Sequence, residues 1–495
     1  MDQNNPAQII IDEVLNGIPS GSVEYCDVRV TTDLLQSYSG GEKQAGIDSE
    51  RRKDSGFGVR VLKNGAWGYA ASSSISIREG LRILQKAIEL ADASSKLAER
   101  RVVFKKRKSF QATWRPRMKI DPFAVSEPDK IQLLENALKI AGSVKGVTAV
   151  SGYMAFHRTD CWFGSTEGTR IFQEITMPSI EMVITAGENH DVQSRSWPSS
   201  HGGFACTGGL EKLQSIILAS EIEKAAEEAV MLTYAPPCPD GVFTVVLAPD
   251  QMSLQIHESI GHPLELDRVF GVEANFSGTS FAQPSLLNKL DIGSEHIDVY
   301  TDPTEEGVLA AYGYDDDGVP VRPVPLIQKG VLVGYLSGRE TAGRLGLASS
   351  GNNRAAGWRH FPINRMSNTR LEPGRFSWDD LLAGIDKGLF MATNRSWTID
   401  DRRETFRFEC EFAQEISGGK LGKVYRNPVY SGRTLDFWRS CDAVGNASLY
   451  QNWGTSSCGK GEPAQSIHTS QGSSPARFRN VSVTSARPSK GHRHG

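Results

Sequence analysis

Residues 242–262 read VFTVVLAPDQMSLQIHESIGH, and this stretch decides how the C-terminal half of the chain folds. Val242–Leu247 is a continuous apolar run rich in β-branched residues, which is typical of a buried strand. Pro249 follows it, and proline is tolerated in the first turn of a helix. The stretch therefore predicts a buried strand that leads directly into a helix with two histidines and a glutamate.

The predicted helix carries the pattern H-E-x-x-x-H at His257, Glu258 and His262. With 10 histidines in 495 residues, an accidental match has a chance on the order of one percent. Five steps leave the two imidazoles about 140° apart on a regular helix, whereas the four steps of H-E-x-x-H leave about 40°. A shared metal ion therefore needs a π-type turn or a helix end between them. Gly261 tolerates unusual backbone angles and Pro263 disfavours the α conformation at His262. The alternative is a helix end with two ordinary histidines.

A hydrolytic zinc site needs three protein ligands and one open position, so the two histidines require a third donor. Cys458 is the candidate, because it lies in a glycine-flanked segment that predicts an accessible loop, and because Lys460 nearby would favour the thiolate. On local grounds alone, buried packing of Cys458 remains the alternative. The other six cysteines are scattered without a C-x-x-C pair, which predicts no disulfide framework, and buried packing is expected for most of them: Cys26, Cys161, Cys206, Cys238, Cys410 and Cys441.

Two further segments resemble ligand-binding motifs but each lacks a required feature. Gly454-x-x-x-x-Gly459-Lys460 matches most of a phosphate-binding loop, but Gly461 stands where a serine or threonine hydroxyl is required. Asp315–Gly318 is an acidic cluster whose spacing is wrong for an EF-hand and right for a polar turn. Nucleotide binding and calcium binding are both disfavoured.

The composition excludes several classes of protein. The chain has 39% hydrophobic and 23% charged residues, which is ordinary for a globular protein and too apolar for a disordered chain. With 55 Lys and Arg against 58 Asp and Glu, no overall field attracts it to nucleic acid or anionic lipid. The N-terminus has no basic segment followed by an apolar one, and no apolar run reaches about 18 residues. We therefore expect a cytoplasmic protein without nucleic-acid or membrane partners.

The fold class predicted is α+β, with mixed sheets and long helices in the N-terminal half and a β-rich C-terminal domain. Short β-rich runs surround the turn at Asn64-Gly65, and helical periodicity marks three segments: 74–93, 128–144 and 210–232. The last of these should end before Pro236-Pro237. The predicted division has four parts: an α+β domain at 1–105, a second α+β domain at 106–235, the β-rich domain at 236–484, and a flexible tail at 485–495.

The chain resembles the TldD/PmbA family, and the TldD side of it. The resemblance runs from about Tyr25 to Val483 and is carried by four segments: 56–61, 257–266, 351–369 and 457–460. It implies a zinc metallopeptidase acting on peptides or unfolded segments in an enclosed site. It also implies that His257, His262 and Cys458 hold the zinc, that Glu258 is the catalytic base, and that the chain forms a homodimer or pairs with a PmbA/TldE-like subunit.

The implied reaction uses a zinc-activated water, from which Glu258 takes a proton. A thiolate ligand makes the zinc a weaker Lewis acid, so another group must stabilise the oxyanion. His360 and Arg354 are candidates, although a structural or surface role is favoured for each. Glu265 is a candidate for a hydrogen bond to a ligand imidazole, and a plain surface carboxylate is the alternative. Substrate selection by addition of a strand to an exposed sheet edge is a further hypothesis. The alternative function is a noncatalytic regulatory or assembly protein, similar to a gyrase modulator, with a structural zinc site.

Overall fold

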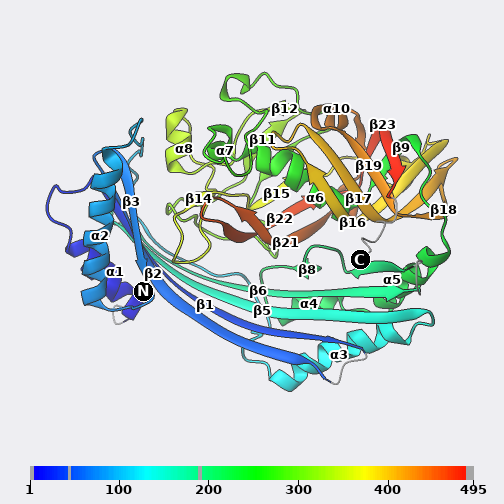
Figure 1. Ribbon diagram of the computed structural model, residues 1–495, viewed down its shortest axis with the longest axis horizontal. Coiled ribbons are helices and arrows are strands. Elements are labelled where there is room, and N and C mark those ends of the chain that lie inside the picture. Colours follow the sequence, from blue (N-terminus) through cyan, green and yellow to red (C-terminus); the bar gives the residue numbers. More distant parts are fainter. Residues whose placement is uncertain (1–4, 43–45, 188–191, 487–495) are drawn as a thin grey trace, which may run out of the picture.

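The N-terminal half of the chain folds on one long, curved sheet (Figure 1). The structure is a computed structural model that describes residues 5–42, 46–187 and 192–486. The sheet has the order β3-β2-β1-β5-β6-β4, and β7 and β8 also pair with β6. Only β4 runs parallel to its neighbour β6. The strands are β1 Tyr25–Gly41, β2 Asp48–Lys63, β3 Ala66–Ser72, β4 Gln111–Trp114, β5 Val147–Ser165, β6 Arg170–Ala186, β7 Gln193–Trp197 and β8 Phe204–Ala205.

The first strands are longer than the short runs that the sequence predicts. The polar centre of β1 stays extended because β2 pairs with one of its edges and β5 with the other, so its backbone groups are satisfied on both sides. The predicted hairpin between β2 and β3 is confirmed, with Asn64 at φ 53° and Gly65 at φ 75°. Tertiary pairing, not local propensity, therefore sets the length of β1.

Helices cover the convex side of this sheet at both ends (Figure 1). α1 Pro6–Asn16 and α2 Ile77–Ser95 pack at the β1–β3 end, while α3 Glu127–Ser143, α4 Leu210–Ile216 and α5 Ala219–Tyr234 pack at the other. The prediction of one helix over 210–232 is wrong, because Ile217 (φ −75°, ψ 75°) and Leu218 (φ −105°, ψ 128°) leave helical angles and separate α4 from α5. α5 ends before Pro236-Pro237, as predicted.

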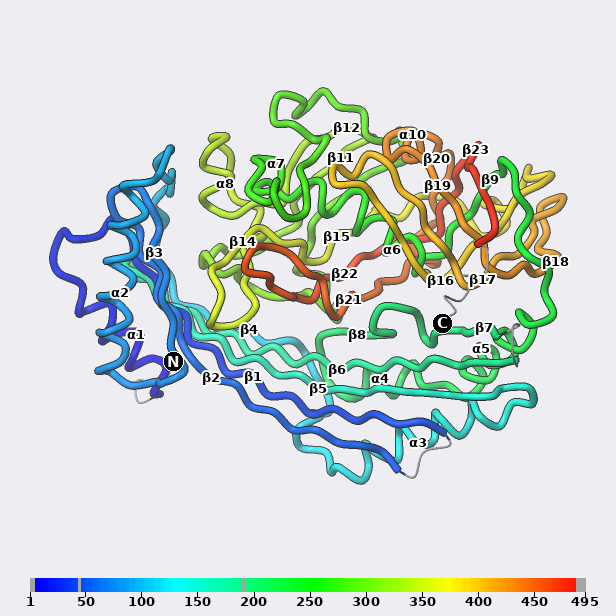
Figure 2. The backbone as a smooth tube through the Cα atoms, in the orientation of Figure 1, coloured from blue at the N-terminus to red at the C-terminus, as the bar shows by residue number. Residues whose placement is uncertain are grey.

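The predicted division of the chain into three domains and a tail stays a prediction. The strands of the first two predicted domains belong to the same sheet, and the C-terminal half lies over its concave side (Figure 2). The predicted tail at 485–495 lies, beyond residue 486, outside the described residues.

Two sheets form the C-terminal half. One has the order β12-β11-β10-β15-β22-β21, and the other has β16-β9-β23-β19-β17-β18, with β20 also paired to β23. The strands of the first sheet are β10 Val299–Thr301, β11 Val324–Gln328, β12 Val331–Leu332, β15 Asn368–Leu371, β21 Gln451–Lys460 and β22 Gln465–Ser473. Those of the second are β9 Gly241–Leu247, β16 Lys387–Ile399, β17 Thr405–Ser417, β18 Lys420–Arg426, β19 Pro428–Arg433, β20 Cys441–Val444 and β23 Ala476–Ser485.

One buried helix, α6 Pro249–Ile256, packs against both of these sheets. Strand β9 leads directly into it, with Pro249 at its first position, which confirms the prediction from residues 242–262. A helix that is buried on nearly every side packs between layers of a core. The remaining elements are α7 Leu266–Val269, α8 Arg339–Arg344, α9 Trp378–Leu382, α10 Thr434–Arg439 and the two-stranded sheet of β13 Asn353–Arg354 and β14 Ile363–Asn364.

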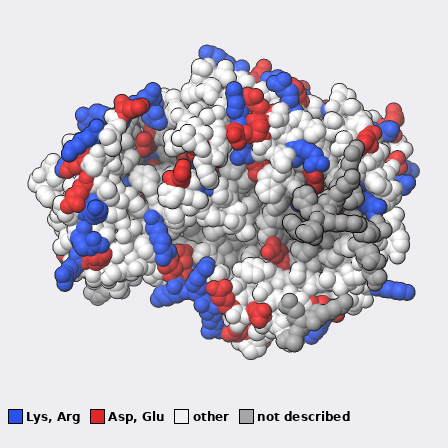
Figure 3. Space-filling view, in the orientation of Figure 1, with Lys and Arg blue, Asp and Glu red and all other residues white. Residues whose placement is uncertain are grey.

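A buried ion-pair network joins the two halves of the molecule. Arg60 on β2 pairs with Asp27 at 2.6 Å and with Asp317 of the C-terminal half at 2.7 Å. Asp317 belongs to the predicted polar turn at Asp315–Gly318, which is confirmed as a turn. On the face shown in Figure 3, Lys and Arg side chains are interspersed with Asp and Glu, which fits the net charge of −3. Over the described residues, no helix has the length and apolar character needed to cross a bilayer.

Candidate metal centre

The helix changes its winding at the predicted histidine motif. His257–Gly261 forms a π-helix, in which the backbone N–H of His262 donates to the carbonyl of His257, and a short 3₁₀ turn follows. The extra residue per turn brings two side chains five positions apart onto nearly the same face. Of the two predicted arrangements, the structure has the π-type turn. The unusual backbone angles predicted at Gly261 and the non-helical conformation predicted at His262 are wrong. His262 (φ −58°, ψ −43°) and Gly261 (φ −58°, ψ −66°) both keep right-handed helical angles.

Gly261 has a packing role instead of a conformational one. A Cβ atom at this position would lie 2.0 Å from Sδ of Met366, which is fully buried. Real non-bonded contacts are about 3.5–4.0 Å. The glycine therefore allows the π-helix to approach the strand region that precedes β15.

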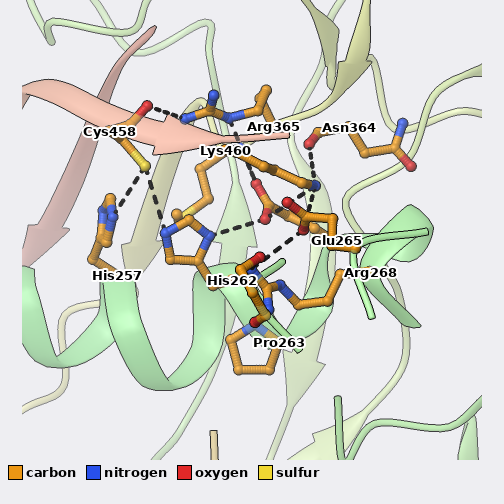
Figure 4. A network of polar contacts seen from close by, with 12 residues as sticks. His257, His262, Pro263, Glu265, Arg268, Asn364, Arg365, Cys458 and Lys460 are labelled. Carbon is orange, nitrogen blue, oxygen red and sulfur yellow. Dashed lines mark hydrogen bonds and ion pairs between the residues drawn. The ribbon is translucent and has the colours of Figure 1, made fainter. Parts of the chain in front are cut away.

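Cys458 lies opposite the two histidines (Figure 4). Its Sγ is 3.4 Å from Nε2 of His257 and 3.5 Å from Nε2 of His262, and one ligand atom from each of the three residues lies within 4.8 Å of the others. The predicted accessible loop is wrong, because Cys458 sits in β21 and is only 4% exposed. A register irregularity between Thr455 and Cys458 interrupts the pairing with β22. All seven cysteines are free, as predicted.

The two imidazoles control the protonation of the thiol. Burial alone would raise the pKa of Cys458, but His257 and His262 beside it hold that pKa well below its usual range. For His262, burial lowers the pKa, yet Cys458 and Glu265 raise it to about 9. The predicted influence of Lys460 on the thiolate is wrong, since its ammonium pairs with buried carboxylates and not with the sulfur. The site therefore favours the thiolate, which is the form that binds metals.

A second layer of polar contacts fixes His262 and Cys458 (Figure 4). Glu265 Oε2 lies 2.9 Å from Nδ1 of His262, which confirms the predicted hydrogen bond and directs Nε2 toward the sulfur. Lys460 Nζ lies 3.2 Å from Glu265 and donates to Asp267 at 2.6 Å. Arg365 donates to the carbonyl of Cys458 at 2.5 Å. These side chains are buried, so their charges act on one another with little screening.

The cluster opens into a cavity of about 660 Å³. Glu258 lines it, and the guanidinium of Arg403 donates to the Glu258 carboxylate. Burial raises the pKa of this carboxyl, but His262, His257 and Arg403 together bring it below its ordinary value. An ionised carboxylate therefore lies in the same cavity as the three ligand atoms. The lining residues are His201, Leu254, His257, Glu258, His262, Trp397, Thr398, Ile399, Arg403 and Thr455 to Gly459.

Three family models match the chain: PmbA/TldA metallopeptidase domain 1 over residues 48–96, the central domain over 120–233, and the C-terminal domain over 240–485. The chain belongs to the PmbA/TldD family. Its relatives include a metalloprotease of Methanocaldococcus jannaschii, with 33% identity over 79% of this chain and 84% of the relative. They also include a zinc metalloprotease TldD homolog of Saccharolobus solfataricus, with 23% identity over 87% of this chain and 90% of the relative.

Solved structures of the PmbA/TldD fold cover nearly the whole chain. TldE of Thermococcus kodakarensis superposes with a TM-score of 0.71 and 15% identity over 97% of this chain and all of that one. A Thermotoga maritima protein superposes with a TM-score of 0.75 and 17% identity over 96% of this chain and all of that one. At these identities the likeness shows the fold, which agrees with the predicted α+β class.

The two predicted oxyanion donors lie away from the cavity of this PmbA/TldD chain. Arg354 lines a separate cavity of about 620 Å³ between the long sheet and the C-terminal half, and its guanidinium donates to the carbonyl of His468 at 2.8 Å. His360 offers its carbonyl to Arg29 at 2.8 Å. Neither residue is among those that line the 660 Å³ cavity in the part of the chain that the structure describes.

Sequence reasoning missed three residues of the cavity: His201, Trp397 and Arg403. His201 follows β7, and its Nε2 lies 2.9 Å from Oδ1 of Asn394. Trp397 and Arg403 lie at the end of β16 and in the turn after it. A lone histidine between Ser200 and Gly202, and a polar turn between two strands, carry no local signal of function. The pairing of the sheets brings them to the site.

Proposed function

We propose that the protein is a zinc-dependent metallopeptidase that hydrolyses peptide bonds in peptides or unfolded segments. One observation carries the proposal: the ligand atoms of His257, His262 and Cys458 lie within 4.8 Å of one another, and Glu258 lines the same cavity. The description of relatives as metalloproteases, in one case as a zinc metalloprotease, supports it.

The donor set fits a zinc ion. Zinc–sulfur and zinc–nitrogen bonds of about 2.3 Å and 2.05 Å at a tetrahedral angle place sulfur and nitrogen about 3.6 Å apart. The observed distances from Cys458 Sγ to the two imidazole nitrogens are 3.4 and 3.5 Å. Three protein ligands are also the number typical of catalytic zinc sites, whereas structural sites use four. The geometry therefore favours a catalytic site over the structural alternative.

The side chains of the cavity divide the work of hydrolysis. A zinc ion bound here would lower the pKa of water toward about 7 and polarise the scissile carbonyl. Glu258 accepts the proton of the attacking water and returns it to the leaving amine. Arg403 and the neighbouring imidazoles keep the Glu258 carboxylate ionised, so it is ready to accept that proton. Glu265 orients His262 and thereby its metal-facing nitrogen.

The edge of β21 supports the proposal that substrates bind as an added strand. β21 is the last strand of its sheet, and Ser456 and Ser457 beside Cys458 are exposed. An extended peptide paired with this edge would pass the cavity and would be read mainly through its backbone. Cleavage that survives N-methylation of the substrate backbone and follows a single side chain would contradict this step. We further propose a cytoplasmic protein that acts as a dimer, with a copy of itself or with a subunit of the TldE fold.

The test compares wild type with the variants Glu258→Gln and Cys458→Ser on denatured casein, with zinc content measured in each. We expect Glu258→Gln to lose at least about 100-fold in rate, the usual size of a general-base contribution, while it keeps its zinc. Cys458→Ser should lose zinc. Glu404→Gln, in the hairpin turn of Arg403 but outside the cavity lining, is the matched control. Unchanged cleavage in Glu258→Gln would favour the noncatalytic alternative, and full zinc retention in Cys458→Ser would remove the third ligand.

A further inference from the structure

One permanent positive charge lines the cavity of the metal cluster. Among the described residues around this cavity, Arg403 is the only lysine or arginine. Its side chain is 13% exposed, and its Nη1 donates to the carboxylate of Glu258. Its buried Nε has no hydrogen-bond partner within the part of the chain that the structure describes. Because a guanidinium has five N–H donors, Arg403 keeps donors free for a second acceptor in the same cavity.

The turn between β16 and β17 holds Arg403 in a strained backbone conformation. Arg403 has φ 63°, which is uncommon for a residue other than glycine. Its N–H donates to the carbonyl of Asp400 at 2.9 Å, and its carbonyl accepts from Oγ1 of Thr434 at 2.6 Å. The N–H of Thr279 holds the carbonyl of Asp401 at 3.1 Å from the other side of the turn. Strain that several contacts maintain is concentrated at functional positions.

We propose that Arg403 is a further catalytic residue, which donates hydrogen bonds to the oxygen of the scissile carbonyl as negative charge develops there. The inference rests on the proposed peptidase function. In that reaction an O–H bond of water breaks, its oxygen bonds to the carbonyl carbon, and the proton passes to Glu258. The π electrons of the carbonyl move onto its oxygen. One negative charge thus leaves the carboxylate that Arg403 contacts and appears on an oxygen in the same cavity.

A guanidinium already in place can follow this charge without reorganising solvent. Preorganised donors of this kind supply a large share of the catalysis of acyl transfer. His201 is the other basic side chain of the cavity outside the ligand set. Burial lowers the pKa of its imidazole, so it is neutral near pH 7 and cannot match the charge of Arg403. The thiolate of the ligand set adds to the need for a cation, because it reduces the positive charge that the metal offers.

The test measures the binding of phenylphosphonate, a tetrahedral oxyanion, to zinc-loaded protein by calorimetry. All proteins carry Glu258→Gln, which removes turnover. It also removes the buried carboxylate, which would otherwise lose its partner when Arg403 is replaced. Three proteins are compared: the single variant Glu258→Gln, the double variant Glu258→Gln/Arg403→Met, and the double variant Glu258→Gln/Arg402→Met. Arg402 is a matched control because it lies in the same turn, is 61% exposed and pairs with Glu404. Imidazole serves as a neutral zinc ligand.

We expect Arg403→Met to weaken phenylphosphonate binding roughly 10- to 100-fold, the range for losing a charge-assisted hydrogen bond. Imidazole binding should change less than about twofold, and Arg402→Met should leave both probes unaffected. Equal affinity for phenylphosphonate with and without Arg403, or an equal loss of both probes, would overturn the inference. Failure of wild type to cleave casein, with the phosphonate result intact, would instead refute the peptidase function and leave Arg403 as an oxyanion-binding residue.

Discussion

The close packing of Gly261 against Met366 predicts that alanine at position 261 destabilises the protein, although alanine has a higher helix propensity than glycine. Gly261 has ordinary helical angles, so alanine alone would stabilise it by about 1 kcal/mol. Its Cβ, however, would lie 2.0 Å from Sδ and 3.0 Å from Cγ of Met366, which is 0% exposed. Overpacking of this kind costs about 1–3 kcal/mol. The net expectation for Gly261→Ala is a loss of up to about 2 kcal/mol.

A double-mutant cycle isolates this clash from propensity. In a Met366→Ala background the obstructing atoms are gone, so Gly261→Ala should stabilise by about 0.5–1 kcal/mol. The assay is urea unfolding followed by circular dichroism, with free zinc held constant because bound metal shifts the midpoint. The same effect of Gly261→Ala in both backgrounds, or a single variant more stable than wild type, would refute the packing explanation for the glycine.

Three further perturbations test the surroundings of the site. Glu265→Gln should lower the zinc affinity, measured by chelator competition, about 10- to 100-fold, because it weakens the group that orients His262. The control Glu273→Gln, which touches no proposed ligand, should leave the affinity unchanged. Equal zinc affinities in wild type and both variants would contradict the role of Glu265. Asp442 has a pKa below its ordinary 3.8, since burial is outweighed by two arginines, so its ionised form stabilises the fold above about pH 4. Asp442→Asn should therefore cost about 0.5–1 kcal/mol at pH 7 after solvent screening, and progressively less as the pH falls below 3.8 and through the lowered pKa of the folded protein. A pH-independent difference in urea midpoint would count against the ion pair. When free zinc is held at 100 times the Kd of the site, its removal by a chelator should lower the free energy of unfolding by about 2.7 kcal/mol. An unchanged melting temperature would show that no ion had been bound.

Local sequence predicted the features that depend on neighbouring residues. The strand and helix of residues 242–262, the hairpin at Asn64-Gly65 and the helix end before Pro236-Pro237 all follow from backbone preferences of a few adjacent residues. The need for either a π-type turn or a helix end between His257 and His262 also followed, because the angular spacing of five residues on a helix is fixed, and the structure has the π-type turn. Such features require no knowledge of the remaining chain.

The errors arose where packing overrides local preference. A loop was predicted at Cys458, yet the segment is a strand because β22 supplies its hydrogen bonds. One helix was predicted over 210–232, but non-helical backbone at Ile217 and Leu218 divides it into α4 and α5. Lys460 was expected to act on the sulfur, whereas the fold presents it to Glu265 and Asp267. For Cys458 and Lys460 the deciding partner lies outside the segment from which the prediction was made.

The sequence by itself determined which chemical groups are available: two imidazoles and a carboxylate on one helix, and a cysteine that could complete a ligand set. Only the tertiary structure decided that the cysteine meets the imidazoles across 201 and 196 positions, and that Arg403 meets Glu258 across 145. The reason is that residue types and spacing fix local geometry, while distances between remote side chains depend on how sheets pair and pack around α6, which no short stretch of the chain encodes.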